Sequence, residues 1–286
     1  MISATIPQGD IDYLLVGHIT RDLVSGGYRP GGTVTYASHI STALGCRTAV
    51  ITSCAAEYEP RAYLPEVALK RIASPETTTF ENRYTDDGRL QWIRGVAAPL
   101  TPEDVPKGWQ RAAIVHLGPV ANEIDPEMVS LFSNSMVGLT PQGWYRQWDA
   151  GGRIQPGNWD AAQQTLPLAA AVILSLEDLP DSAALDEVRA HARLVVLTEG
   201  AAGCTVFFDQ QSRHLPAPSV NEVDPTGAGD IFAAAFLVRL KQTRGNPWEA
   251  ADYANTVAAA SVTQATIDEK VNAIQSALRV KGLVSV

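Results

Sequence analysis

Short apolar runs alternate with amphipathic stretches along most of the chain, and this pattern predicts alternating strands and helices. Runs that are apolar throughout are typical of strands buried on both faces. The stretch 33–45 has apolar residues at helical spacing and ends at Gly45, a common helix terminus. Such alternation indicates right-handed βαβ units around a mostly parallel sheet. The predicted strands are 12–17, 48–53, 112–118, 171–176, 194–200 and 204–208.

The middle of the chain has a different pattern. Segments 77–84 and 89–95 are rich in Thr, aromatic and β-branched residues, and Asp86-Asp87-Gly88 lies between them. This combination predicts a β-hairpin over 77–95. Two interpretations are open: a flap beside the active site, or an edge of the main sheet. The last third is predicted to be helical, over 227–242, 247–263 and 268–279.

Composition and organisation narrow the function classes. No repeat or linker interrupts the sequence, so we expect residues 1–286 to form a single domain. A net charge of −9 makes nucleic acid an unlikely partner. Three cysteines without a CxxC pair argue against a disulfide framework or a zinc site and favour the cytoplasm. The start of the chain lacks the basic region of a signal peptide, and no apolar stretch is long enough to span a membrane.

The most informative segment is 221–240, where Asp224-Pro225-Thr226 leads into Gly227-Ala228-Gly229-Asp230 and an alanine-rich helix. Small residues at a helix start let the backbone approach a ligand closely. The unpaired N–H groups there bind anions, so residues 227–229 are predicted to hold a phosphoryl group in transfer. Asp230 either complements the helix dipole or accepts the proton of an acceptor hydroxyl. In this sequence context we favour the second role.

This segment resembles the DTGAGD signature of the ribokinase-like (PfkB) carbohydrate kinases. The resemblance implies a three-layer α/β/α sandwich with a mostly parallel central sheet and a β lid. It also implies ATP as co-substrate, Mg²⁺, a catalytic base at Asp230 and an anion hole at Gly227, Ala228 and Gly229. The N-terminal part is similar to the same family, through GHITRD (17–22) and a Gly31-Gly32 pair before a helix. By this resemblance Asp22 binds substrate hydroxyls, and Gly31 and Gly32 let the backbone approach the acceptor.

Further positions follow from the family pattern with less specific motifs. The turn 175–178 falls where the family has N-x-x-E, although the same residues are also an ordinary helix start. On this resemblance Mg²⁺ lies beside Glu177 and Asp178. The positions expected to contact the nucleotide are Ser175, Thr198, Gly200, Gly203, Thr226 and Asn255.

The sequence departs from the family at three places. Tyr36 and Ser175 each replace an Asn, and only residues 23–30 separate Asp22 from Gly31, which predicts a small or reduced lid. A reduced lid weakens the case for a lid-mediated dimer, so the chain is expected to be a monomer or a homodimer. Tyr36 and the segment 139–149 resemble the inositol-kinase-like branch, in which Arg146 would hold an acceptor or phosphate group. Alternatively, Arg146 is an exposed loop residue.

Together these features predict an ATP-dependent kinase acting on a hydroxyl of a small sugar or cyclitol. A nucleoside kinase on the same fold is the nearest alternative. A non-catalytic sugar- or nucleotide-binding relative is another, although a pure sensor has no need of a base at Asp230. No Walker A motif occurs, which excludes the other common phosphate-binding loop of kinases. No GxGxxG follows strand 12–17, which argues against a dinucleotide-binding protein.

Overall fold

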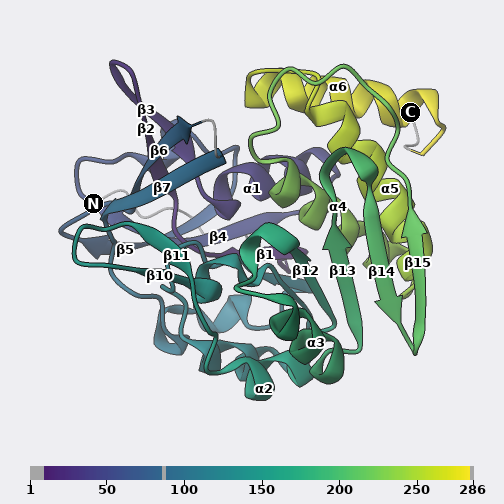
Figure 1. The fold of residues 1–286 in the computed structure, drawn as a ribbon, viewed down its shortest axis with the longest axis horizontal. Coiled ribbons are helices and arrows are strands. Elements are labelled where there is room, and N and C mark those ends of the chain that lie inside the picture. Colours follow the sequence, from purple (N-terminus) through teal and green to yellow (C-terminus); the bar gives the residue numbers. More distant parts are fainter. Residues whose placement is uncertain (1–9, 86–87, 284–286) are drawn as a thin grey trace.

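The computed structural model describes residues 10–85 and 88–283, so Asp86 and Asp87 of the predicted turn lie outside the described residues. A nine-stranded sheet forms the centre, in the order β15-β14-β13-β12-β9-β8-β1-β4-β5 (Figure 1). The strands from β5 to β13 are parallel, and β14 is antiparallel to both of its neighbours. The strands are β1 (Tyr13–Val16), β4 (Thr48–Ala55), β5 (Ala68–Ser74), β8 (Ile114–Leu117), β9 (Met136–Leu139), β12 (Ala171–Ser175), β13 (Leu194–Thr198), β14 (Cys204–Phe208) and β15 (Gln211–Leu215). The predicted mostly parallel sheet is confirmed.

Helices cover both faces of this sheet because alternate residues of each strand point to opposite sides. In β1, Tyr13 and Leu15 pack toward four helices, whereas Leu14 and Val16 pack into a second core with α2, α3 and several 3-10 turns. Figure 1 shows the two helical layers on either side of the strands. The first layer contains α1 (Thr33–Ala43), α4 (Ala228–Gln242), α5 (Pro247–Ser261) and α6 (Ile267–Val280); the second contains α2 (Ala162–Thr165) and α3 (Ser182–His191). The three-layer sandwich is therefore as expected.

Helix α4 lies very close to the sheet. A Cβ atom at Gly138, in β9, would approach the side chain of Leu237 to 2.4 Å, so only glycine permits this distance. The α4 residues 231–238 are all buried. Close packing along its length holds the N-terminus of α4 at a fixed place beside the carboxyl ends of the parallel strands.

The lid is a separate four-stranded sheet with the order β3-β2-β6-β7. Its strands are β2 (Thr20–Val24), β3 (Gly27–Gly31), β6 (Thr79–Thr85) and β7 (Gly88–Gly95). The predicted hairpin 77–95 thus belongs to neither edge of the main sheet and forms only half of the lid. The other half is the short segment after Asp22, where Gly26 has φ +84° and permits a two-residue turn between β2 and β3. The lid is small, as expected, but it is not reduced to a single hairpin. A further two-stranded ribbon pairs β10 (Arg146–Trp148) with β11 (Ile154–Pro156).

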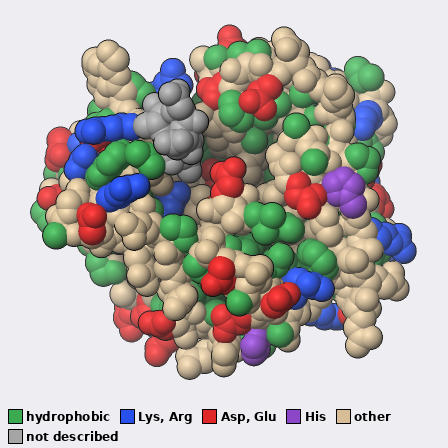
Figure 2. All heavy atoms as spheres, viewed as in Figure 1, with side chains coloured by type: hydrophobic (Ala, Val, Ile, Leu, Met, Phe, Trp, Pro, Cys, Tyr) green, Lys and Arg blue, Asp and Glu red, His purple; other side chains and the backbone are tan. Residues whose placement is uncertain are grey.

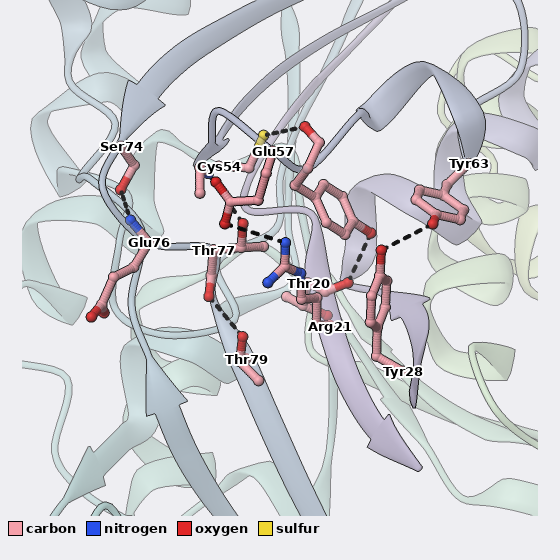
Figure 3. A network of polar contacts seen from close by, with 12 residues as sticks. Thr20, Arg21, Tyr28, Cys54, Glu57, Tyr63, Ser74, Glu76, Thr77 and Thr79 are labelled. Carbon is pink, nitrogen blue, oxygen red and sulfur yellow. Dashed lines mark hydrogen bonds and ion pairs between the residues drawn. The ribbon is translucent and has the colours of Figure 1, made fainter. Parts of the chain in front are cut away.

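Aromatic and ionic contacts anchor the base of the lid to the main body (Figure 3). The Arg21 guanidinium lies 5.1 Å from the ring centre of Tyr28 and 5.0 Å from that of Tyr58, and it contacts Glu57 at 3.7 Å. The hydroxyls of Tyr28 and Tyr63 hydrogen-bond at 3.1 Å. Cation–π contacts of this kind stabilise a fixed orientation. They therefore hold the first lid hairpin against the segment that follows β4.

No helix among the described residues is both long enough and apolar enough to cross a bilayer.

Candidate active site

A large cavity lies between the lid and the carboxyl ends of the parallel strands, with a volume of about 1490 Å³. This is the edge at which open α/β sheets bind ligands. Figure 2 shows the molecule hollowed between the lid and the C-terminal helices, with acidic side chains at the margin. The predicted site residues that line the cavity are Asp22, Gly32, Tyr36, Arg146, Ser175, Glu177, Asp178, Thr198, Thr226, Gly227, Ala228, Gly229 and Asp230. Both ends of the chain therefore contribute to one site.

The start of α4 has the backbone geometry of an anion site. Gly227 is the N-cap, with φ +78°, a left-handed conformation that favours glycine. A Cβ atom there would lie 2.4 Å from the ring of Tyr36, so the aromatic ring packs directly on the backbone. No side chain caps this helix start. The Ala228 N–H donates to the Pro225 carbonyl at 3.0 Å, whereas the N–H groups of Gly227 and Gly229 have no acceptor among the described residues. These two N–H groups are therefore available to an anion in the cavity that both residues line.

Asp230 follows in the same turn and has an unusual acidity. Removal of water around its carboxyl raises its pKa from 3.8 to about 6. A hydrogen bond from the buried Thr33 hydroxyl lowers this pKa, the negative charges of Asp178 and Asp22 raise it, and the positive charge of Arg146 lowers it. A carboxylate with this pKa is still ionised at neutral pH and is a better base than an ordinary aspartate.

Three residues that are predicted to bind the acceptor come from different elements. Asp22 lies on lid strand β2, Tyr36 on α1, and Arg146 at the start of β10. Burial raises the pKa of the Tyr36 hydroxyl, and the nearby Asp22 and Asp230 charges raise it further, so the phenol stays protonated. Arg146 donates from Nη1 to the Val120 carbonyl at 2.7 Å and lies over the Phe80 ring at 5.2 Å. It is therefore a fixed, half-buried cation in the cavity rather than an exposed loop residue.

The predicted glycine pair shapes this side through the backbone. A Cβ atom at Gly31 would lie 2.6 Å from Oδ2 of Asp22, so glycine leaves room for that carboxylate. Gly32 has φ +86°, and a Cβ atom there would lie 2.3 Å from the His18 carbonyl oxygen. Gly31 is outside the set of residues that line the cavity, and its role is to accommodate Asp22.

The turn after β12 is both a helix start and a wall of the cavity. The Ser175 hydroxyl accepts from the Glu177 N–H at 3.3 Å, and Asp178 Oδ2 accepts from the Ser175 N–H at 3.0 Å. Gln142 Nε2 donates to the other oxygen of Asp178 at 2.6 Å. The Asp178 carboxylate thus holds local structure, whereas the exposed Glu177 carboxylate accepts no hydrogen bond from any described residue.

The donor set suits a magnesium ion that is shared with a phosphate ligand. Mg²⁺ prefers oxygen ligands, keeps several waters, and is usually bound by one or two carboxylates plus substrate phosphates. Glu177 supplies such a carboxylate on the cavity wall. Within the described ranges, no three His, Cys, Asp or Glu side chains lie close enough to hold an ion by themselves. The protein alone therefore does not form a complete metal cage here.

Three of the predicted nucleotide positions lie behind the wall of the cavity. Asn255 is buried on α5, and its Nδ2 donates to the Leu215 carbonyl at 2.9 Å. A Cβ atom at Gly203 would lie 2.2 Å from the same carbonyl oxygen, and Gly200 has φ +56° in the turn before it. Gly200, Gly203 and Asn255 thus shape the edge formed by β14 and β15 rather than line the cavity.

The structure adds site residues that the sequence analysis did not identify. Thr33 bonds to Asp230, Gln142 fixes Asp178, and Lys270 lines the cavity from α6. Asp224 also lines it, and its carboxylate accepts from Thr226 N at 2.9 Å and Oγ1 at 2.5 Å. Asp224 and Gln142 lie in segments 221–240 and 139–149, which the sequence analysis singled out without giving either residue a role. Thr33 directly follows the Gly31-Gly32 pair, and Lys270 had no sequence signal.

Comparisons with known proteins agree with this geometry. Residues 169–272 match the pattern described as pfkB family carbohydrate kinase. The chain is 30% identical over 262 residues to an inositol 3-kinase of Oryza sativa subsp. japonica, a match that covers 81% of this chain and 63% of that protein. The chain thus spans less than two thirds of that relative. It is 24% identical to a cytidine kinase of Thermococcus kodakarensis, with 84% and 91% covered.

A solved structure shows the same fold. It is a pyrophosphate-dependent kinase in the ribokinase family, complexed with a pyrophosphate analog and myo-inositol, with a TM-score of 0.73 and 23% identity. The match covers 87% of this chain and 94% of that one. At this identity the likeness establishes the ribokinase fold.

Proposed function

Because residues 169–272 match the pfkB family carbohydrate kinase pattern, we propose that the chain belongs to this family and transfers a phosphoryl group to a hydroxyl of a small sugar or cyclitol. One observation carries this proposal: Asp230, with its pKa raised to about 6, directly follows the open amides of Gly227 and Gly229 in a cavity that Asp22 also lines. A base and an anion site in adjacent residues are what transfer to a hydroxyl requires.

Each group has a defined part in the reaction. The acceptor binds between Asp22 and Arg146, where the carboxylate accepts hydrogen bonds from neighbouring hydroxyls and the guanidinium donates them. Asp230 accepts the proton of the hydroxyl that attacks. The amides of Gly227 and Gly229 stabilise the negative charge of the transferring phosphoryl group. The lid, with its hairpin 77–95, covers the acceptor and limits the access of water.

We propose ATP as the phosphoryl donor, bound with Mg²⁺ on the side of Ser175, Thr198 and Thr226. When bound, the magnesium ion neutralises phosphate charge, and Glu177, with Asp178 beside it, would hold it through water. Gly200, Gly203 and Asn255 would support the nucleotide from behind, through the β14–β15 edge. Pyrophosphate is the donor to compare directly, since the related structure named above uses it.

The polar lining favours a polyol over a nucleoside as the acceptor. Besides Asp22 and Arg146, the lid and its surroundings present Asn82, Gln91 and Thr140 to the cavity. The Phe80 ring is covered by the Arg146 guanidinium, so that ring is not free to stack on a base. Each of these polar side chains can hydrogen-bond to a hydroxyl-rich ring, while apolar side chains such as Leu64 and Ile173 line other parts of the cavity.

We also propose that the protein works in the cytoplasm. Cys46, Cys54 and Cys204 are all free thiols in the structure, which suits a reducing compartment.

The test is product formation with two donors and four acceptor classes. Purified protein with Mg²⁺ is incubated with ATP or pyrophosphate and with inositols, hexoses, pentoses or nucleosides, and the phosphorylated product is identified. We expect turnover with ATP and an inositol or sugar, and its loss in Asp230→Asn. Turnover of nucleosides alone would make the protein a nucleoside kinase. Tight acceptor binding without product from either donor would make it a sensor.

A further inference from the structure

Lys270 is buried in a way that is rare for lysine. Its side chain is 1% exposed, and it is among the largest fully buried side chains of the described residues. It lies in the first turns of α6, whose start is fixed by reciprocal hydrogen bonds between Thr266 and Glu269. Removing an ammonium group from water is costly unless it gains close partners. The hydrogen-bond partners of Lys270 therefore indicate what offsets the cost of burying its ammonium group.

Those partners are two backbone carbonyls of the loop that leads into the anion site. Lys270 Nζ donates to the Asp224 carbonyl at 2.5 Å and to the Thr226 carbonyl at 3.2 Å. The same loop is held by the Asp224 side chain on Thr226 and by the Asp224 N–H on the Val262 carbonyl at 3.1 Å. Burial lowers the pKa of Lys270, and the charges of Asp224 and Glu222 oppose that change.

The Thr226 contact acts directly on the anion site. The Thr226 carbonyl and the Gly227 N–H belong to one peptide unit, and in a trans peptide these two groups point in opposite directions. A cation on the carbonyl side therefore fixes the N–H direction toward the cavity. It also polarises the unit, since hydrogen bonds in a chain strengthen one another.

We propose that Lys270 is a positioning residue for phosphoryl transfer: a covalently attached cation that orients and polarises the Thr226–Gly227 peptide unit. Backbone carbonyls are also the ligands that a potassium ion takes in proteins. Since the ammonium group already occupies these carbonyls, the enzyme needs no added monovalent cation. This inference rests on the proposed function and adds to it that turnover is independent of monovalent cations.

The first test compares three variants in a buffer whose cation is tetramethylammonium. Lys270→Ala leaves space beside the two carbonyls, Lys270→Met fills it without charge, and Lys281→Met is the control. Lys281 is also at α6, and its Nζ donates to the Thr256 hydroxyl at 2.8 Å, outside the cavity. We expect kcat to fall about 10²-fold in both Lys270 variants, the scale for a misplaced reacting group, with the acceptor KM little changed. Lys281→Met should match the wild type.

Rescue separates positioning from a purely structural role. Potassium, ammonium or methylammonium ions should raise the kcat of Lys270→Ala at least tenfold. They should not raise the kcat of Lys270→Met. The proposal is overturned if Lys270→Ala keeps more than a tenth of the wild-type kcat in tetramethylammonium buffer. It is also overturned if none of these cations restores the lost kcat. If both variants fail to fold, the wild type decides. Equal turnover in tetramethylammonium and potassium buffers supports the proposal, and a tenfold activation by potassium overturns it.

A second measurement does not depend on turnover. Hydrogen exchange at the amides of 227–230 should be faster in Lys270→Met than in the wild type and unchanged in Lys281→Met. Unchanged exchange in Lys270→Met overturns the positioning role even if no acceptor is ever phosphorylated. If exchange is faster in Lys270→Met, as expected, but the wild type phosphorylates no acceptor, the result counts against the proposed function and not against the positioning role.

Discussion

Replacing Asp230 by Asn should lower the reaction rate but raise the stability of the fold. The burial that makes Asp230 a good base also makes its ionised carboxylate destabilising. The amide keeps the size of the carboxylate and can still accept from Thr33, but it cannot take a proton. A well-placed base contributes typically about 10²–10⁴-fold to the rate. We therefore expect kcat to fall by about that factor in Asp230→Asn, with the donor Kd nearly unchanged.

The stability effect should have the opposite sign. The pKa of Asp230 rises from 3.8 to about 6 in the folded state, and each pKa unit corresponds to about 1.4 kcal/mol. Because the folded pKa is raised, the protonated side chain favours folding below pH 3.8, and this contribution is lost as the pH rises through 6. Above pH 6 the ionised group thus costs up to about 3 kcal/mol. Asp230→Asn should be more stable than the wild type at pH 8 by up to that amount.

The assay is a denaturant titration of both proteins at pH 8 and near pH 4, together with kcat at pH 8. We expect the stability gain at pH 8 to vanish near pH 4. In the wild type, kcat/KM should fall as the pH decreases through about 6, where Asp230 gains its proton. If Asp230→Asn retains more than about a tenth of kcat, Asp230 is not the base. If it is less stable than the wild type at pH 8, the burial argument is wrong.

Four other variants test the geometry around this base. Asp22→Asn should raise the acceptor KM at least about tenfold, because it removes a charge-assisted contact; unchanged kinetics would exclude Asp22 from the acceptor site. Gly227→Ala should lower the melting temperature and nearly abolish activity, since its Cβ atom would meet Tyr36 at 2.4 Å, whereas Gly229→Ala meets nothing within 4 Å and should melt like the wild type. Equal melting of the two would contradict the packing argument. Arg29→Ala removes an ion pair of 3.8 Å between the exposed Arg29 and the half-buried Asp224, and it should cost less than about 1 kcal/mol in a denaturant titration; a larger loss would mean that this bridge holds the lid.

The parts of the fold that could be predicted are those with a local sequence signal. Strands buried on both faces, such as β1 and β4, are continuous apolar runs, and α6 shows helical spacing with a clear start. The lid hairpin of β2 and β3 gave no such signal, because its residues are mostly exposed and show no alternation. Its partner β6 lies more than 50 residues away, and a pairing over that distance is not encoded in either strand alone.

The candidate site likewise contains residues with a local sequence signal and residues without one. The residues 227–230 could be identified because an anion site needs small residues and a special backbone angle at one place in the chain. Lys270 could not, since a lysine on a helix normally indicates a solvated face and its partners are backbone carbonyls 44 and 46 residues away. The turn 175–178 is a helix start, because the Asp178 carboxylate caps it. Its magnesium role stays a prediction, for which the cavity-lining Glu177 is the candidate ligand.

The arrangement of the cavity also sets a time at which activity can begin during synthesis. The acceptor half, from Asp22 to Tyr36, is made first, and Asp230 follows about 200 residues later. At about 5–20 residues per second, roughly 10–40 s pass before α4 is made. During that interval the face of α1 that will pack on α4 has no partner, and Thr33 has no carboxylate to bond. A ribosome-bound chain in this state can hold at most half a site, so the proposed phosphoryl transfer can start only after the C-terminal helices have folded onto α1.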